Sequence, residues 1–325
     1  MKAWTWERYG SPDVLALRDV DEPAIARDEV LVRVRAVSVN PYDWRHLRAD
    51  PHLVRLSIGL RRPKAGLVLG ADLAGVVERV GDEVTGFRPG DEVFGEVPLG
   101  AFAEAVAVSP TRLAHKPADL PFAQAASVSM AAHTALQGLR DEGRLAPGQR
   151  VLINGASGGI GTFAVQLAKT LGAEVTGVCS TRNLELVSSL GADEVVDYTR
   201  EDFTERKQRY DLLMDIVGDR SLSAFRRALT PRGTLVIVGG IASSSRLLGP
   251  AAQMLRGALA SPFVGHRIAS VQWKPNAEDL RFLAELMETA RIKPVLDRTY
   301  PFTELPDALR HLEQRHARGK IAVTL

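Results

Sequence analysis

The sequence has almost no cysteine and no histidine pattern that would hold a metal ion. Cys179 is the only cysteine among 325 residues, which excludes an internal disulfide and any multi-cysteine metal cluster. It falls in a predicted strand, where a buried, inert thiol is expected. The seven histidines form neither H-x-x-x-H nor H-E-x-x-H. The sequence therefore predicts no metal site.

Long apolar runs and blocks of one charge are also missing. No apolar run approaches the ~18–20 residues that a membrane-spanning helix needs, and the N-terminal residues MKAWTWERYG lack a signal pattern. The net charge is only +2, with lysine and arginine spread along the chain. We therefore expect no membrane partner, no nucleic-acid partner and a cytoplasmic location. The length of 325 residues and the 45% hydrophobic content predict a globular protein of about two domains.

The most informative stretch covers residues 148–169 and reads GQRVLINGASGGIGTFAVQLAK. A short apolar run is followed by glycines, and apolar residues then return at helical spacing, which predicts a strand, a tight turn and a helix. Glycine would let the backbone approach a pyrophosphate, toward which the helix N-terminus would point. Ala156 replaces the first glycine of G-x-G-x-x-G, while Gly158 and Gly161 keep the second and third. By itself, the match is weak, and the alternative is a tight connection such as any α/β domain contains.

The residues after this turn favour the nucleotide-binding interpretation. Further strands are predicted at 174–180, 195–196, 212–217 and 235–238, with helix-like segments between them. Such alternation is typical of a parallel, doubly wound sheet. The second strand ends in Ser180-Thr181-Arg182, without the acidic residue that would hold a ribose 2′-hydroxyl. The sequence therefore favours the 2′-phosphate of NADPH.

The segment before residue 120 is predicted to be rich in strands. Residues 30–39 alternate valines with Arg33 and Arg35, and Asn40-Pro41 follows. The polar cluster that begins there either makes a turn at Asn40-Pro41, with Asp43 capping the short helix after it, or lines a cleft. The basic residues 46–64 form either a surface excursion or a lid.

The remaining chain is expected to contain further helices and strands. They include one helix from Pro121 to Leu136 capped by Asp119, a helix at 247–259, an amphipathic helix at 277–290, and a last strand at 321–325 that returns to the N-terminal domain.

Taken together, these segments resemble the medium-chain dehydrogenase/reductase superfamily, and within it the zinc-free quinone oxidoreductases. The resemblance runs over essentially the full length and is carried by SVNPYDW, GADLAGVVERVG, NGASGGIGTFAVQLAK and GKIAVTL. It implies an α/β protein with a Rossmann doubly wound parallel sheet and a β-rich GroES-like catalytic domain. It further implies a nicotinamide cofactor in the cleft between them and a homodimer. The expected limits are 1–120 with 291–325 for the GroES-like domain, and 121–290 for the Rossmann domain.

The resemblance also assigns site residues. Zinc-dependent relatives have a catalytic cysteine at the position of Asn40 and Gly-His-Glu at the position of Gly70-Ala71-Asp72. Asn40 and Tyr42 are therefore expected to act on the substrate. Arg45 stands where several quinone reductases have tyrosine. The residues expected to bind NADPH are Asn40, Thr134, Gly155, Ala156, Gly158, Gly159, Ile160, Ser180, Arg182, Tyr198, Val238, Gly239, Gly240 and Lys320.

The expected activity is zinc-independent hydride transfer from NADPH to a quinone or another electron-poor conjugated carbonyl. The alternatives are an enone or enal double-bond reductase and a cofactor-binding protein with little turnover. The short-chain reductases share the glycine motif, but they require Tyr-x-x-x-Lys. None of the five tyrosines has a lysine four positions on, so the short-chain class is set aside.

Overall fold

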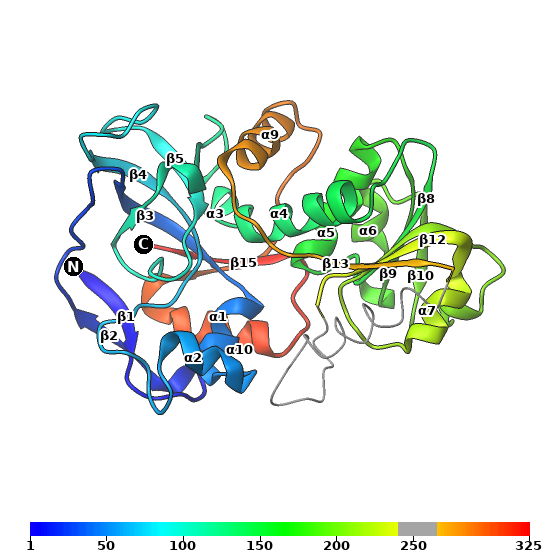
Figure 1. Cartoon of the computed structure of the whole chain (residues 1–325), viewed down its shortest axis with the longest axis horizontal. Coiled ribbons are helices and arrows are strands. Elements are labelled where there is room, and N and C mark those ends of the chain that lie inside the picture. The colour runs from blue at the N-terminus through cyan, green and yellow to red at the C-terminus, as the bar shows by residue number, and fades with distance from the viewer. Residues whose placement is uncertain (240–264) are drawn as a thin grey trace. The chain divides into compact units, whose positions relative to one another are not determined.

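The computed structural model describes residues 1–239 and 265–325, which form two compact units (Figure 1). The first unit combines Met1–His133 with Lys274–Leu325, and the second is Thr134–Trp273. The first unit is therefore discontinuous. The expected limits at 120/121 and 290/291 differ from these. Helix α3 (Phe122–Ala125) packs on strands β3 (Val30–Val39) and β4 (Asp72–Val80), and helix α9 (Ala277–Glu288) packs on β7 (Leu113–His115). Both helices thus belong to the first unit.

The first unit is built on a seven-stranded sheet in the order β14-β15-β3-β4-β5-β7, with β6 also paired to β3. Its strands are β3 (Val30–Val39), β4 (Asp72–Val80), β5 (Glu92–Glu96), β6 (Ala105–Val108), β7 (Leu113–His115), β14 (Leu296–Pro301) and β15 (Lys320–Thr324). β1 (Lys2–Trp6) and β2 (Leu15–Asp19) form a separate antiparallel pair. β15 lies antiparallel beside β3, which confirms that the tail returns to the N-terminal domain.

The alternation of valine and arginine side chains along β3 explains which of its two faces is buried in this sheet. Val32 and Val34 are buried, whereas Arg33 is half-buried and Arg35 is exposed. The buried valines join a core that also takes Leu73 from β4 and Val323 from β15. Since each such side chain contributes about 1.5–3 kcal/mol when buried, segments far apart in the sequence stabilise one core.

The helices of the first unit correct one prediction. They are α1 (Pro41–Arg48), α2 (Arg55–Ile58), α3, the start of α4 (Ser129–Gln137), α9 and α10 (Leu305–Glu313). The single helix expected from Pro121 to Leu136 is wrong, because the chain leaves helical structure between α3 and α4, and Pro121 rather than Asp119 precedes α3. The Ser127 hydroxyl donates to the Gln124 carbonyl at 2.6 Å, a local bond that competes with helix continuation.

The second unit contains a six-stranded, all-parallel sheet in the order β10-β9-β8-β11-β12-β13. The strands are β8 (Arg150–Asn154), β9 (Glu174–Cys179), β10 (Glu194–Asp197), β11 (Tyr210–Asp215), β12 (Leu229–Ile237) and β13 (Arg267–Ser270), and the helices include α5 (Gly159–Thr170), α6 (Leu184–Ser189) and α7 (Leu222–Ala228). This confirms the doubly wound prediction. The strand order reverses between β8 and β11, and ligands of such sheets bind outside the carboxyl ends of the strands at that point. The helix expected at 247–259 lies outside the described residues.

Candidate functional site

The glycine turn of the second unit has the predicted strand–turn–helix form. β8 ends at Asn154, Gly155 takes φ 92°, and α5 begins after Gly158. The backbone N–H groups of Gly155 and Ala156 both donate to the Val178 carbonyl, at 3.2 and 3.0 Å, which ties the turn to β9. A Cβ on Gly161 would lie 2.1 Å from the Gly155 carbonyl oxygen. Only glycine at 161 therefore lets α5 pack this closely on the turn.

The same turn fits a pyrophosphate. A Cβ added to Gly158 would find its nearest atom, the Gly155 oxygen, 3.5 Å away, so this side of the turn is open. Gly158 is the N-cap of α5 and offers no side chain to the first N–H groups of the helix. Those donors and the positive end of the helix dipole are suited to phosphate oxygens. Gly159 and Ile160 form the half-buried first turn of α5.

The end of β9 has the residues expected around a 2′-phosphate. Ser180 follows the strand, Arg182 is exposed, and Tyr198 at the end of β10 is 51% exposed. The Asn183 amide bonds to the hydroxyls of Ser157 and Ser180, at 3.0 and 3.3 Å, which connects this segment to the glycine turn. The structure therefore links the turn to the serine at the end of β9.

Asp197 is an acidic residue near the end of β9 that was not predicted to lie there. It ends β10, and its carboxylate accepts hydrogen bonds from the Thr181 hydroxyl at 2.5 Å and from the Thr199 hydroxyl at 2.7 Å. The bond from Thr181, more than any other contact, lowers the pKa of Asp197. The pairing of β10 with β9 could have indicated this position, because it places Asp197 beside Cys179, the last residue of β9.

The carboxyl ends of β8 and β11 form a second polar group. The Asn154 amide donates to Asp215 at 2.9 Å, and burial raises the pKa of Asp215. The backbone N–H of Val238 donates to the Asp215 carbonyl at 2.9 Å, and Gly239 takes φ 133° with no atom within 4 Å of an added Cβ. The predicted residue Gly240 lies outside the described residues. Thr134, from α4, is 7% exposed and belongs to the second unit.

Asn40 belongs to the first unit, where it ends β3 and is the N-cap of α1. It is 3% exposed, and both ends of its side-chain amide are hydrogen-bonded. The amide nitrogen Nδ2 donates to Asp72 Oδ2 at 2.9 Å, and the ammonium of Lys320 donates to Asn40 Oδ1 at 2.5 Å. The structure thus joins Asn40 to Lys320, a residue that is 280 positions later in the chain.

Asp72, for which no role was predicted, is the centre of this cluster. It is fully buried at the start of β4. Besides the Asn40 amide, it accepts from the Ser38 hydroxyl at 2.7 Å, from the Lys320 ammonium at 3.1 Å and from the backbone N–H of Met130 at 2.9 Å. The Met130 bond gives the carboxylate a backbone donor from the first turn of α4. Ser38, Asn40, Asp72 and Lys320 are called the Asn40 cluster below.

Tyr42 and Asp43 lie in the first turn of α1. Tyr42 is partly buried, and Asp43 is fully buried. Asp43 Oδ2 accepts from the backbone N–H of Asn40 at 2.7 Å, and Asp43 Oδ1 has no hydrogen-bond partner among the described residues. Burial, with a further contribution from the nearby Asp72, raises the pKa of Asp43 to about 8. Burial also raises the pKa of Tyr42 to about 12, so this hydroxyl is a donor at neutral pH.

No group of three or more His, Cys, Asp or Glu side chains that could hold a metal ion is found among residues 1–239 and 265–325. At two positions where the resemblance places zinc ligands, the chain has the amide of Asn40 and the carboxylate of Asp72, which is already bonded to an ammonium. Zinc is held by thiolate, imidazole or carboxylate groups, so only Asp72 is of a suitable type and the pair does not fit the ion. In the same described residues, no helix is long and apolar enough to cross a membrane. Cys179 is buried, which raises the pKa of its thiol to about 11.

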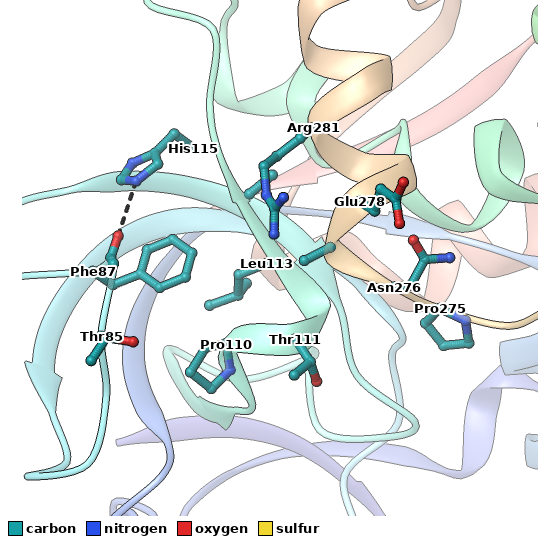
Figure 2. A pocket seen from close by; sticks show the side chains of 13 residues that line it. Thr85, Phe87, Pro110, Thr111, Leu113, His115, Pro275, Asn276, Glu278 and Arg281 are labelled. Carbon is teal, nitrogen blue, oxygen red and sulfur yellow. Dashed lines mark hydrogen bonds between the residues drawn. The ribbon is translucent and has the colours of Figure 1, made fainter.

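A separate pocket of about 650 Å³ lies in the first unit, between β7 and the start of α9. One wall is an aromatic pair, Phe87 and His115, with ring centroids 5.0 Å apart. Figure 2 shows the Arg281 side chain directed toward Leu113 inside it. None of the predicted site residues lines this pocket.

The segment 46–64 contains the end of α1 and α2, and its leucines are unusually exposed. Leu53, Leu56 and Leu60 are 52%, 69% and 67% exposed. Such side chains are normally buried, but nothing in the described residues covers them. A lid therefore stays a prediction.

The fold and these motifs define a class, and comparisons with known proteins agree with it: the chain belongs to the medium-chain dehydrogenase/reductase superfamily, among its quinone oxidoreductase-like members. Residues 26–118 match the model of the alcohol dehydrogenase GroES-like domain, and residues 190–323 match that of the zinc-binding dehydrogenases. The chain is 35% identical over 360 residues to the mitochondrial NAD(P)H oxidoreductase RTN4IP1 of Mus musculus, covering 100% of this chain and 89% of that protein.

Two further relatives are similar in sequence or in structure. The chain is 34% identical over 337 residues to the 2-methylene-furan-3-one reductase of Solanum lycopersicum, covering 99% of this chain and 79% of the relative. The solved structure of the quinone oxidoreductase from Coxiella burnetii superposes with a TM-score of 0.85 at 30% identity, covering 100% and 99% of the two chains.

Proposed function

We propose that this protein is an NADPH-dependent, zinc-independent reductase that delivers hydride to a quinone or another electron-poor conjugated carbonyl. The observation that carries the proposal is the buried side-chain amide of Asn40, bonded to the Lys320 ammonium at the position where zinc-dependent relatives have a ligand. The relatives named above as an NAD(P)H oxidoreductase and a quinone oxidoreductase support it.

The chain's own residues would hold the cofactor at its phosphates. The open turn at Gly158 and the first N–H groups of α5 would bind the pyrophosphate. Ser180, Arg182 and Tyr198 would surround the 2′-phosphate, for which a guanidinium is a strong partner. When bound, the nicotinamide supplies a hydride.

Asn40 and Tyr42 would then act on the acceptor oxygen. One hydrogen of Asn40 Nδ2 is given to Asp72, which leaves the second for a ligand. Tyr42, whose hydroxyl stays protonated, would be the second donor. Two neutral donors stabilise developing negative charge less than a metal ion does. We therefore favour acceptors that are already electron-poor over plain aldehydes and ketones.

Double-bond reduction of an enone or enal is the second candidate function. It is favoured by the similarity to a 2-methylene-furan-3-one reductase, since that name describes a carbon–carbon double bond conjugated to a ketone. The two reactions would use the same cofactor and the same donors. They differ in product, because one yields a hydroquinone and the other a saturated ketone.

An acceptor screen with product analysis tests both functions. NADPH oxidation is followed with small quinones, enones, enals, saturated aldehydes and, in reverse, ethanol-type alcohols, with and without a zinc chelator. The proposal expects quinones or enones to be reduced fastest and chelation to leave the rate unchanged. Faster alcohol oxidation, or about one tightly held zinc per chain, would contradict it. NADPH binding without reduction of any acceptor would favour a cofactor-binding protein with little turnover. The homodimer and the cytoplasmic location stay predictions, which light scattering and cell fractionation would test.

A further inference from the structure

The orientation of the Asn40 amide is fixed by the charges on either side of it. The carbonyl oxygen Oδ1 accepts from the Lys320 ammonium, and the nitrogen Nδ2 donates to the Asp72 carboxylate. A flipped amide would place N–H groups against an ammonium and an oxygen against a carboxylate, and both contacts would be repulsive. Only one orientation is therefore consistent with the partners.

Asp72 makes four contacts that no neutral side chain of this shape could reproduce. Oδ2 accepts from Ser38, Asn40 and Lys320, and Oδ1 accepts from the N–H of Met130. An amide has only one oxygen. In either orientation, asparagine at 72 would turn an N–H₂ group toward at least one of these donors.

The Lys320 ammonium and the Asp72 carboxylate also polarise the Asn40 amide in the same sense. A donor on Oδ1 and an acceptor on Nδ2 polarise the same conjugated group, and hydrogen bonds in such a chain strengthen one another in a buried setting. The cluster qualifies as buried, since Asp72 is 0% and Lys320 is 4% exposed.

We propose that Asp72 is a positioning residue, which holds the Asn40 amide so that its second Nδ2 hydrogen is presented to the acceptor oxygen. This inference rests on the proposed function for the role of Asn40, but the geometry it describes stands separately. Asp72 itself touches no substrate. Its effect is to prevent the amide from rotating and to exclude the orientation that would present an oxygen.

Ser38 provides a matched control. Its hydroxyl bonds to the same oxygen of Asp72, at 2.7 Å, and it is equally buried, but no bond joins it to Asn40. Ser38→Ala therefore removes a buried hydrogen bond from Asp72 and leaves Asn40 bound on both sides. A merely structural role for Asp72 would make the two variants behave alike.

The test compares Asp72→Asn with Ser38→Ala in three measurements. With the best quinone or enone acceptor, we expect kcat to fall at least tenfold in Asp72→Asn and less than threefold in Ser38→Ala. We expect the dissociation constant for NADPH to change less than threefold in both. In protein with ¹⁵N-labelled asparagine, the side-chain N–H₂ signals of Asn40, assigned by their loss in Asn40→Asp, should shift and exchange faster with water only in Asp72→Asn.

Equal losses of kcat in the two variants, or unchanged Asn40 signals in Asp72→Asn, would overturn the inference. If Asp72→Asn does not fold, Asp72→Glu replaces it, because it keeps the charge and moves the oxygens by one methylene. The Asn40 signals should then shift as well, and unchanged signals would contradict the proposal. If the unmodified protein reduces no acceptor, the proposed function fails, while the amide signals still decide whether Asp72 positions Asn40.

Discussion

The glycine turn and the Asn40 cluster are built in opposite ways. The turn lies within residues 155–161, and the backbone makes it: its contacts are N–H groups, a carbonyl and the absence of Cβ atoms. The Asn40 cluster is made by side chains that come from β3, β4 and β15. The turn is therefore sensitive to added volume and indifferent to charge, whereas the cluster depends on the placement of two opposite charges.

The largest expected effect is on the turn. In Gly161→Ala, the new Cβ would lie 2.1 Å from the Gly155 oxygen, so α5 must move, at a cost of about 1–3 kcal/mol or more. We expect loss of measurable NADPH binding in a titration. Gly158→Ala is the control, because its Cβ meets nothing closer than 3.5 Å and its φ is −83°. Gly158→Ala should therefore fold normally. It should still bind NADPH at least tenfold more weakly, because the new Cβ would occupy the open side of the turn that is expected to face the pyrophosphate. Wild-type binding by Gly161→Ala would show that the close packing of α5 is not required.

The second prediction concerns the charge beside the Asn40 cluster. The pKa of Asp43 is raised to about 8 in the folded state, against about 3.9 in an unfolded chain. Between these values the folded state keeps a proton that the unfolded state releases. The free energy of unfolding should therefore fall as pH rises, with a limiting slope of about 1.4 kcal/mol per pH unit, and level off above pH 8.

Asp43→Asn mimics the protonated acid and should remove this slope. Denaturant unfolding at pH 5, 6, 7 and 8 measures it in both proteins. The expected result is a flatter profile in the variant, with stabilities that converge toward pH 5. Identical slopes would mean that Asp43 is ionised in the folded protein.

The third prediction separates the two cofactors at the end of β9. Arg182→Ala should weaken NADPH binding roughly ten- to a hundredfold, since a charged hydrogen bond contributes on the order of 1.5–3 kcal/mol. NADH, which has only a 2′-hydroxyl, should be nearly unaffected. Fluorescence titration of both cofactors measures the difference. Equal affinities for NADPH and NADH in the unmodified protein would contradict the predicted preference for NADPH.

The smallest expected effects are on the stability of the two units. One helix cap is removed in each unit, and the losses of stability are compared. The Ser221 hydroxyl accepts from the N–H of Ala224 at 3.2 Å in the second unit, and Asn276 accepts from the N–H of Asp279 at 2.7 Å in the first. Replacing either by alanine should cost about 1 kcal/mol. If the units unfold separately, each variant shifts one calorimetric transition only. If both variants shift a single transition, the units unfold together.

The sequence predicted structure well where neighbours in the chain make the contacts. The limits of β3, the strand–turn–helix at 151–170 and the amphipathic helix α9 follow from local periodicity and glycine placement. The break between α3 and α4 was missed, because the carboxylate that caps α4 comes from Asp72, far away in the chain. Asp197 was missed for a similar reason, since only strand pairing brings it beside Thr181.

Asn40 and Lys320 were both found through a family resemblance, but their contact with each other and with Asp72 was not predicted. No periodicity connects residues 40, 72 and 320. Their meeting depends on β15 pairing with β3 and on β4 pairing with the other side of β3. The motif GADLAG marked the position of Asp72, and only the fold shows what its carboxylate contacts.

Because β15 is the last strand in the chain, its place in the sheet also affects when the first unit can finish folding during synthesis. Residues 134–273 leave the ribosome before β15 does, and domains generally fold as units while synthesis continues. Until residues 320–324 emerge, β3 lacks one of its neighbouring strands and Asn40 lacks its ammonium partner. An unpaired strand edge is a template for pairing with another chain. Until β15 pairs, residues 36–39 of β3 would therefore lack a partner strand on the side where β6 already pairs with residues 30–33.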